Sequence, residues 1–514
     1  MGNKACAIAV LSALVLLATL YLLAIGPYWK ISPDSVSYVE GAVSLASGQG
    51  YLKDGEPVLV FPPGTSLLFT IPLLLFPNSY LALNALVTGF ALLAHAACYV
   101  LFRKRMDSTW AALTVLLSLG STLVFYQSTR LLSDIIYLFL SPVALIASEQ
   151  TKSRHTGRAS GLPLACLVLA SCMTRLVGVT LIGAIALHAL FTRRREEAWR
   201  ITLVLMLLVA LPVALWETRN LRLGISSLKL ALQNQQWVDE AGYVSPSGLL
   251  YRMYRNLDDF GALGGILING TLSRFGAERS YFELSARVAS LAFLCLGLGL
   301  SIARRLAPTD VYCAVYLLTI AAYEPGIDVR KLVPLVPLLF YYALVGTRFI
   351  AQQASRSVGS TAAAMVYVAL LAYTACFLRI GVGGMVREIP LEHTSPFGTY
   401  PIKYPQNYDV QRLALWLREN SDPSDKYLAQ HVDMMAYFTE REGHYLPFSA
   451  DPHILLNLLD TKDIKYVLAD KKKPMVRQYM LPVVRAHPEL FSLILEEEQA
   501  ALYEFHAAEP AGSD

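Results

Sequence analysis

The stretch ACAIAVLSALVLLATLYLLAI, from Ala5 to Ile25, stays apolar for about 20 residues, the length that an α-helix needs to cross a bilayer. It is long for the core of a signal peptide and no A-x-A-like cleavage site follows it, so we expect a retained first span. Charged residues make up 16% of the chain, whereas a soluble globular chain carries about 25%. The sequence therefore predicts a membrane protein.

Apolar runs of similar length recur along the chain and predict an α-helical polytopic fold with about eleven transmembrane helices. They lie at 5–25, 79–102, 109–127, 134–149, 160–174, 176–191, 200–216, 286–303, 310–323, 331–347 and 359–380. We expect residues 1–380 to form the membrane module.

Basic clumps predict the orientation of these spans, because short loops rich in Lys and Arg stay in the cytoplasm. The clumps fall in alternate connections, at 103–105, 152–158, 193–195, 304–305 and 348–356. We therefore expect a cytoplasmic N-terminus in the inner membrane, and loops 26–78 and 217–285 and the segment 381–514 on the periplasmic side. If one weak run is a re-entrant or buried helix instead, the membrane orientation of every segment after it is reversed.

The segment 381–514 changes in composition and predicts a small α/β domain. Strand-like runs at 426–430, 465–469, 491–495 and 500–505 alternate with helical stretches such as 410–420. This domain either shapes access for an acceptor or only caps the helical bundle.

Other features exclude several function classes. The net charge is only +4 and the basic residues are not gathered in one stripe, so nucleic acid is not an expected partner. Neither the cysteines nor the histidines have zinc-binding spacing, and no glycine-rich nucleotide loop is present. His95, inside the second apolar run, is expected to be a satisfied interior histidine.

Charged residues map to the outer ends of the predicted spans, where they are costly unless they serve a function. Asp34 follows the first span and precedes Tyr38 by four residues, so a short helix places both on one face; alternatively, Asp34 only caps that helix. The others are Arg130, Asp134, Arg175, Arg219 and Arg330. Each arginine either binds a phosphate or extends to the lipid headgroups, and Asp134 is either a second site carboxylate or an ion-pair partner of Arg130.

A set of short motifs in a fixed order resembles the membrane glycosyltransferases of the C-type fold (GT-C). It is similar in particular to bacterial relatives of protein O-mannosyltransferases and of the lipid A aminoarabinose transferase. The motifs are Asp34 after the first span, Gly48-x-Gly50-Tyr51, Pro62-Pro63-Gly64, Leu132-Ser133-Asp134, Thr174-Arg175, Trp216-x-x-Arg219-Asn220 and Arg330-x-x-x-Pro334-x-x-Pro337.

The resemblance implies transfer of a sugar, with inversion, from a polyprenyl-phosphate carrier to a glycan, lipid or protein acceptor. Asp34 and Asp134 are then the catalytic candidates, and Tyr38, Arg130, Arg175, Arg219 and Arg330 the substrate-binding ones, with Arg219 and Arg330 on the donor phosphate. Ser35 stands where many relatives have a second acid, so a divalent metal is possible but unassigned. Phe61 stands where the aminoarabinose type has a lysine before Pro-Pro. A transporter or flippase for a lipid-linked sugar, or a polymerase or ligase of lipid-linked glycans, is the alternative.

Overall fold

The computed structural model describes residues 2–150, 161–192, 195–234, 242–259, 265–267, 281–323, 329–394 and 405–507. Contacts divide the chain into two units. The first unit holds the described parts of Met1–Trp29, Ser37–Leu232 and Tyr243–His393. The second holds those of Lys30–Val36, Gln233–Gly242 and Thr394–Asp514.

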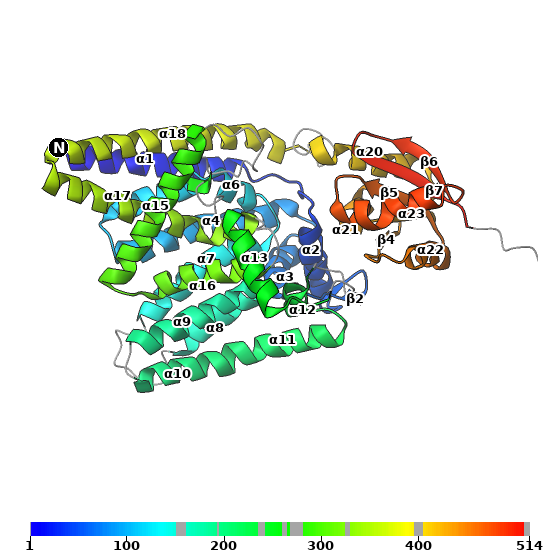
Figure 1. The fold of residues 1–514 in the computed structure, drawn as a ribbon, viewed down its shortest axis with the longest axis horizontal. Helices are drawn as coiled ribbons and strands as arrows, with labels where there is room; N and C mark the ends of the chain where they lie inside the picture. The colour runs from blue at the N-terminus through cyan, green and yellow to red at the C-terminus, as the bar shows by residue number, and fades with distance from the viewer. Residues whose placement is uncertain are drawn as a thin grey trace, which may run out of the picture. The chain divides into compact units, whose positions relative to one another are not determined.

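The first unit is built almost entirely from helices (Figure 1). Each predicted apolar run coincides with a helical segment, because an apolar run of this length satisfies its backbone hydrogen bonds as a helix. The main helices are α1 (Gly2–Leu23), α2 (Pro33–Ala46, whose first turn groups with the second unit), α3 (Gly64–Leu75), α4 (Tyr80–Arg103), α5 (Ser108–Leu119), α6 (Thr122–Ser128), α7 (Ser133–Gln150), α8 (Gly161–Thr174), α9 (Val179–Thr192), α10 (Arg195–Leu205), α11 (Leu211–Arg222), α12 (Ser227–Leu232), α13 (Pro246–Asp259), α15 (Tyr281–Arg304), α16 (Pro308–Tyr323), α17 (Val336–Ser357) and α18 (Ser360–Glu392).

Short irregular segments join several of these helices. Two are 3-10 turns, η2 (Leu176–Gly178) and η5 (Val329–Leu335), and η3 (Met206–Ala210) is a π-helical segment that joins α10 to α11. A two-residue hairpin, β1 (Leu52–Lys53) with β2 (Glu56–Pro57), lies in the first loop.

By length and composition, four helical segments within the described residues are able to cross a bilayer: Tyr80–Arg103, Glu196–Arg222, Val329–Ser357 and Ser360–Glu392. Helices α5 and α6, bent by 64°, form a fifth if they count as one span. Helix α18 shows the expected apolar surface, since Met365, Val368 and Leu371 are 66 to 70% exposed. The chain is a multi-pass membrane protein, and the total of eleven spans stays a prediction.

Basic clumps gather at one end of the helical unit. Lys104, Arg105, Arg304 and Arg305 line one cavity, and Arg348 donates to a carboxylate oxygen of Asp107 at 2.9 Å. Three of the five predicted clumps therefore share an end of the helices. The clump 152–158 and the first two residues of 193–195 lie outside the described residues.

The second unit contains a mixed five-stranded sheet in the order β4-β3-β5-β7-β6. Strand β3 pairs in parallel with β4 and β5, whereas β7 pairs antiparallel with β5 and β6. The elements are α20 (Pro405–Asn420), β3 (Lys426–Ala429), α21 (Val432–Thr439), β4 (Gly443–Tyr445), α22 (Pro452–Thr461), β5 (Ile464–Asp470), η6 (Val476–Met480), α23 (Leu481–Ala486), β6 (Phe491–Glu496) and β7 (Ala500–Phe505).

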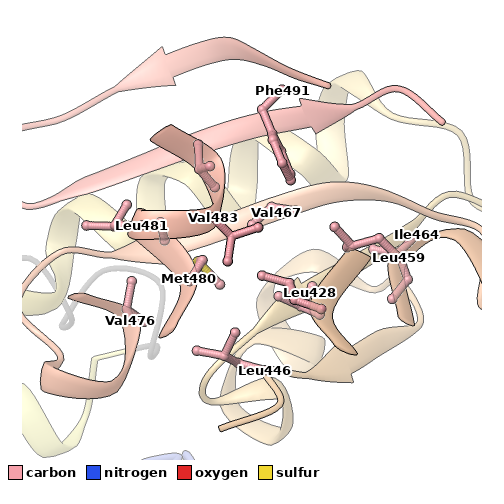
Figure 2. Close-up of a cluster of buried hydrophobic side chains, with 13 residues drawn as sticks. Leu428, Leu446, Leu459, Ile464, Val467, Val476, Met480, Leu481, Val483 and Phe491 are labelled. Carbon is pink, nitrogen blue, oxygen red and sulfur yellow. The ribbon is translucent and has the colours of Figure 1, made fainter. Parts of the chain in front are cut away.

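One apolar cluster forms the core against this sheet (Figure 2). Leu428 and Val467 on neighbouring strands pack with Met480 and Leu459 from the segments that cover them. The predicted α/β character of the C-terminal segment is confirmed. Helix α18 continues past residue 381, where the sequence predicted the outer domain to start, and ends at Glu392.

Candidate functional site

An ion pair between Asp134 and Arg175 lies at the centre of the candidate site in the first unit. Asp134 is in the first turn of α7, where the positive end of the helix dipole favours a carboxylate, and it is 1% exposed. Arg175 follows α8 directly and is 18% exposed in its side chain. A buried carboxylate needs such a partner, because an uncompensated charge there is strongly unfavourable.

Tyr38 connects this pair to the first loop. Its hydroxyl donates to Oγ of Ser133 at 3.0 Å, next to Asp134, and Arg175 approaches the same oxygen at 3.5 Å. The Tyr38 ring meets the Phe61 ring edge-on at 5.3 Å, just before the Pro-Pro-Gly turn. Tyr38 is only 4% exposed, and its predicted role in substrate binding stays a prediction.

A second guanidinium comes from the 3-10 segment η5. Arg330 is close enough for its positive charge to influence Arg175 electrostatically. The hydroxyl groups of Tyr38 and Tyr316 also influence Arg175. The start of η5 is held in place because the Tyr316 hydroxyl donates to the Lys331 carbonyl at 2.7 Å. Two guanidinium groups thus lie close enough to influence each other at this end of α7, and a guanidinium is well suited to bind a phosphate.

A layer of tyrosines next to the ion pair was missed by the sequence analysis. The hydroxyl groups of Tyr137 and Tyr312 lie 3.1 Å apart, and the Tyr137 and Tyr316 rings stack with centroids 6.3 Å apart. Tyr137 is three residues after Asp134, so helical spacing was the available signal for placing it on the same face.

Arg219 contacts the first loop. Its guanidinium donates to the Val58 carbonyl at 3.3 Å and to the Asn220 side chain at 2.7 Å, and lies 4.9 Å from the Trp216 ring centre. Ser227 donates to the Val60 carbonyl at 3.0 Å, where Val60 has a φ of 67°. A β-branched residue rarely adopts such a φ, and strain of this kind persists only where its surroundings enforce it.

The Gly-x-Gly-Tyr and Pro-Pro-Gly motifs meet at the same loop. Gly48 and Gly50 have φ values of 73° and 100°, which glycine adopts at little cost. The Tyr51 hydroxyl donates to the Phe61 carbonyl at 3.0 Å, and burial raises the pKa of Tyr51 to about 12 despite opposing effects of Ser66 and Arg219.

Gly64 begins α3 against the end of α8. A Cβ atom at this position would lie 2.5 Å from the Met173 carbonyl oxygen and 2.8 Å from the Thr174 nitrogen. The turn therefore packs against the backbone that leads into Arg175, and only glycine permits this approach.

Arg130 contacts Tyr126, whereas one interpretation of the sequence was an ion pair between Arg130 and Asp134. Its guanidinium lies 4.4 Å from the Tyr126 ring centre and donates to the Tyr126 hydroxyl at 2.7 Å. It is 4% exposed. The structure thus brings Asp134 together with Arg175, and Arg130 together with Tyr126.

Asp34 lies in the first turn of α2, in the part of that helix that groups with the second unit. Two hydrogen bonds join Ser35 to Ser32 at the start of this helix. The Ser35 hydroxyl donates to the Ser32 carbonyl at 2.8 Å and accepts from the Ser32 amide at 2.8 Å. The predicted arrangement of Asp34 and Tyr38 one turn apart on a helix is confirmed. The Asp34 carboxylate also acts on His431, raising the pKa of that imidazole against the larger lowering by burial.

His95 fits its expected structural role. Its Nδ1 lies 2.7 Å from the Ala91 carbonyl and its Nε2 lies 3.0 Å from the Ser118 hydroxyl, inside the bundle. Among the residues that the structure describes, no three His, Cys, Asp or Glu side chains come together as a metal site.

This arrangement of helices is the C-type fold of membrane glycosyltransferases. Two crystal structures of ArnT, an aminoarabinose transferase, from Cupriavidus metallidurans share the fold over its full length. The apo state has a TM-score of 0.58 at 13% identity and covers 99% of this chain and 100% of the ArnT chain. The state bound to undecaprenyl phosphate has a TM-score of 0.56 at 13% identity and covers 98% and 99%.

An archaeal oligosaccharyltransferase also shares the fold. AglB from Archaeoglobus fulgidus, in complex with an inhibitory peptide and a dolichol-phosphate, has a TM-score of 0.57 at 11% identity and covers 94% of this chain and 72% of AglB. No protein-family model and no curated protein sequence matches the chain. The fold class predicted from the sequence is confirmed.

Proposed function

We propose that this protein is an integral membrane glycosyltransferase that moves a sugar from a polyprenyl-phosphate donor to an acceptor at the outer face of the cytoplasmic membrane. The observation that carries the proposal is the cluster of Asp134, Arg175 and Arg330 at one end of α7, within a fold shared with structures that bind undecaprenyl phosphate or dolichol-phosphate. The acceptor is a glycan, a lipid or a protein.

In the proposed reaction, an acceptor hydroxyl attacks the anomeric carbon and the bond from that carbon to the phosphate oxygen breaks. Asp34 accepts the proton of the hydroxyl, and the phosphate leaves with the electron pair of the broken bond. Attack from the face opposite the leaving group inverts the anomeric centre. A base placed for this step contributes about 10² to 10⁴ in rate.

Arg330 and Arg219 are the proposed contacts of the leaving phosphate, and Arg175, also a substrate-binding candidate from the sequence, is proposed as a supporting charge. A guanidinium suits this task because it donates two parallel hydrogen bonds and keeps its charge. Asp134 then has a positioning role, since it holds Arg175 beside Arg330. Arg219 also donates to the Val58 carbonyl, in the loop that precedes α3.

The orientation is also a proposal. Three basic clumps at one end of the helices favour that end as cytoplasmic, which places Asp134 at the outer end of α7. The C-terminal sheet is then periplasmic.

The full chain reconstituted in vesicles with a polyprenyl-phosphate sugar labelled in the sugar tests the function. A transferase releases free polyprenyl phosphate and moves the label to an acceptor in an added extract. Nuclear magnetic resonance should show that the anomeric configuration of the product is inverted relative to that of the donor. A flippase instead moves the intact labelled lipid between leaflets without releasing polyprenyl phosphate. That second result would contradict the proposal.

A further inference from the structure

The cavity at the basic end of the helical unit is lined by residues other than the proposed site residues. Its volume is about 610 Å³, within the range of small-molecule sites. The charged and titratable side chains that line it are Lys104, Arg105, Glu149, His188, Arg304 and Arg305. These residues come from the ends of α4, α7, α9 and α15 and the turns that follow them.

Helix α7 separates this cavity from the Asp134 site. Asp134 is in its first turn and Glu149 is next to its last residue. Fifteen residues of α-helix at 1.5 Å each span about 22 Å, so the two sites lie at opposite ends of the helix. The cavity is thus independent of the proposed sugar transfer, and by the orientation proposed above it lies at the cytoplasmic headgroup level.

The acidic groups near the cavity fix Arg105 in place. Glu149 pairs with Arg105 at 2.6 Å and with Lys104 at 3.3 Å. Asp310, which is fully buried, lies 3.6 Å from Arg105. Its oxygens also accept from the Tyr342 hydroxyl at 2.8 Å and from the Ala307 amide at 2.9 Å. A fully paired carboxylate of this kind holds its partner in one position.

The remaining basic groups give the cavity an excess of positive charge. Four cations face two carboxylates. In the part of the chain that the structure describes, Arg304 and Arg305 have no acidic partner, and both side chains are exposed. Two free guanidinium groups next to a fixed third one match the oxygens of a phosphate group.

The wall of the cavity is not only polar. Tyr341, Leu306 and Val345 also line it, and the Tyr341 ring stacks on Phe102 with centroids 4.9 Å apart. Basic pockets between membrane helices on the cytoplasmic side suit anionic headgroups. We propose that this cavity binds a phosphate group, carried by an anionic phospholipid headgroup or present as a free phosphate, through Arg304, Arg305 and Arg105.

Binding to the purified full chain in neutral detergent tests this proposal. The probes are phosphatidylglycerol in mixed micelles, phosphatidylcholine as the neutral lipid, and inorganic phosphate. We expect phosphatidylglycerol to bind, and Arg304→Gln/Arg305→Gln to weaken it about tenfold or more, because charge-assisted hydrogen bonds are lost. A lysine pair at the same positions should recover part of the binding.

The matched control removes the same charge from the same end of the helices. Arg103 and Arg356 are exposed and do not line the cavity, so Arg103→Gln/Arg356→Gln should change binding less than twofold. Competition by inorganic phosphate identifies a free phosphate as sufficient, whereas binding of phosphatidylglycerol alone identifies the lipid headgroup. Equal loss in the two double variants, or equal binding of phosphatidylcholine, would overturn the proposal. Correct folding is checked by gel filtration, and sugar transfer is measured separately in every variant.

Discussion

The Tyr38 hydroxyl donates a hydrogen bond of 3.0 Å to Oγ of Ser133, the residue directly before Asp134. One end of the Tyr38 side chain thus lies at the ion pair of α7 and α8, and its ring lies against Phe61 of the first loop. Because α2 carries Tyr38 one turn after Asp34, this hydrogen bond fixes the rotation of the helix about its own axis.

Tyr38→Phe should therefore lower kcat/KM for sugar transfer while preserving the fold. The lost hydrogen bond contributes about 1 kcal/mol, or about fivefold in rate, since the Phe61 ring contact is kept. Ser133→Ala should have a similar effect, and the double variant should be no worse than either single one. If the two effects simply multiply, the hydrogen bond has no role in catalysis.

The loss of stability on breaking the Asp134–Arg175 ion pair should depend on which of the two residues is replaced. Arg175→Gln removes the guanidinium that pairs with Asp134, whose side chain is 2% exposed, and should lower the free energy of unfolding by about 3 kcal/mol. Asp134→Asn should cost less, because Arg175 is 18% exposed and reaches more solvent. The double variant should be more stable than Arg175→Gln alone. Thermal unfolding in detergent measures all three, and additive losses would show that the two charges do not stabilise each other.

Gly64→Ala should destabilise the protein and reduce transfer, since the new Cβ would lie 2.5 Å from the Met173 carbonyl oxygen. Relief requires α3 and the end of α8 to separate, at a cost of about 1 to 3 kcal/mol. Gly89→Ala in α4 is the matched control, because nothing lies within 4 Å of its Cβ position. That change should be neutral or stabilising by up to about 1 kcal/mol. Similar unfolding temperatures for the two variants would contradict the close packing.

The second unit should lose stability in mild acid through His431. Burial lowers the pKa of His431 to about 4, with Lys473 also lowering it and Asp433 and Asp34 raising it. The unfolded imidazole titrates near pH 6.5, so between pH 7 and pH 5 the unfolded chain binds a proton that the folded one does not. The opening free energy of β3 and β5 in hydrogen exchange should fall by about 1 kcal/mol over this range, discounted for the partial exposure of the ring. His431→Gln should remove that dependence, and an unchanged slope would assign it to other groups.

The apolar runs were sufficient to predict the helices, since length and composition alone make a segment suited to the bilayer. The strand-like runs around Tyr427, Val467 and Leu502 were likewise visible from their composition. The strand β4, only three residues long with a glycine and a histidine, carried no such signal.

The pairing within the site could not be read from the sequence. Asp134 and Arg130 are four residues apart, which suggested an ion pair between them, but Asp134 pairs with Arg175 from another helix end. Which partner is chosen depends on how α7 packs on α8, and that is a tertiary property. The same holds for Arg219, which donates to the carbonyl of Val58, a residue of the first loop that is distant in sequence.

The most direct test is Asp34→Asn, measured on the full chain for both transfer and binding of the polyprenyl-phosphate donor. The amide is similar in size to the carboxylate but does not accept a proton, so transfer should fall at least 100-fold while the donor Kd changes less than about twofold. If the Asp34→Asn variant transferred sugar at the wild-type rate, this result would contradict the assignment of Asp34 as the base.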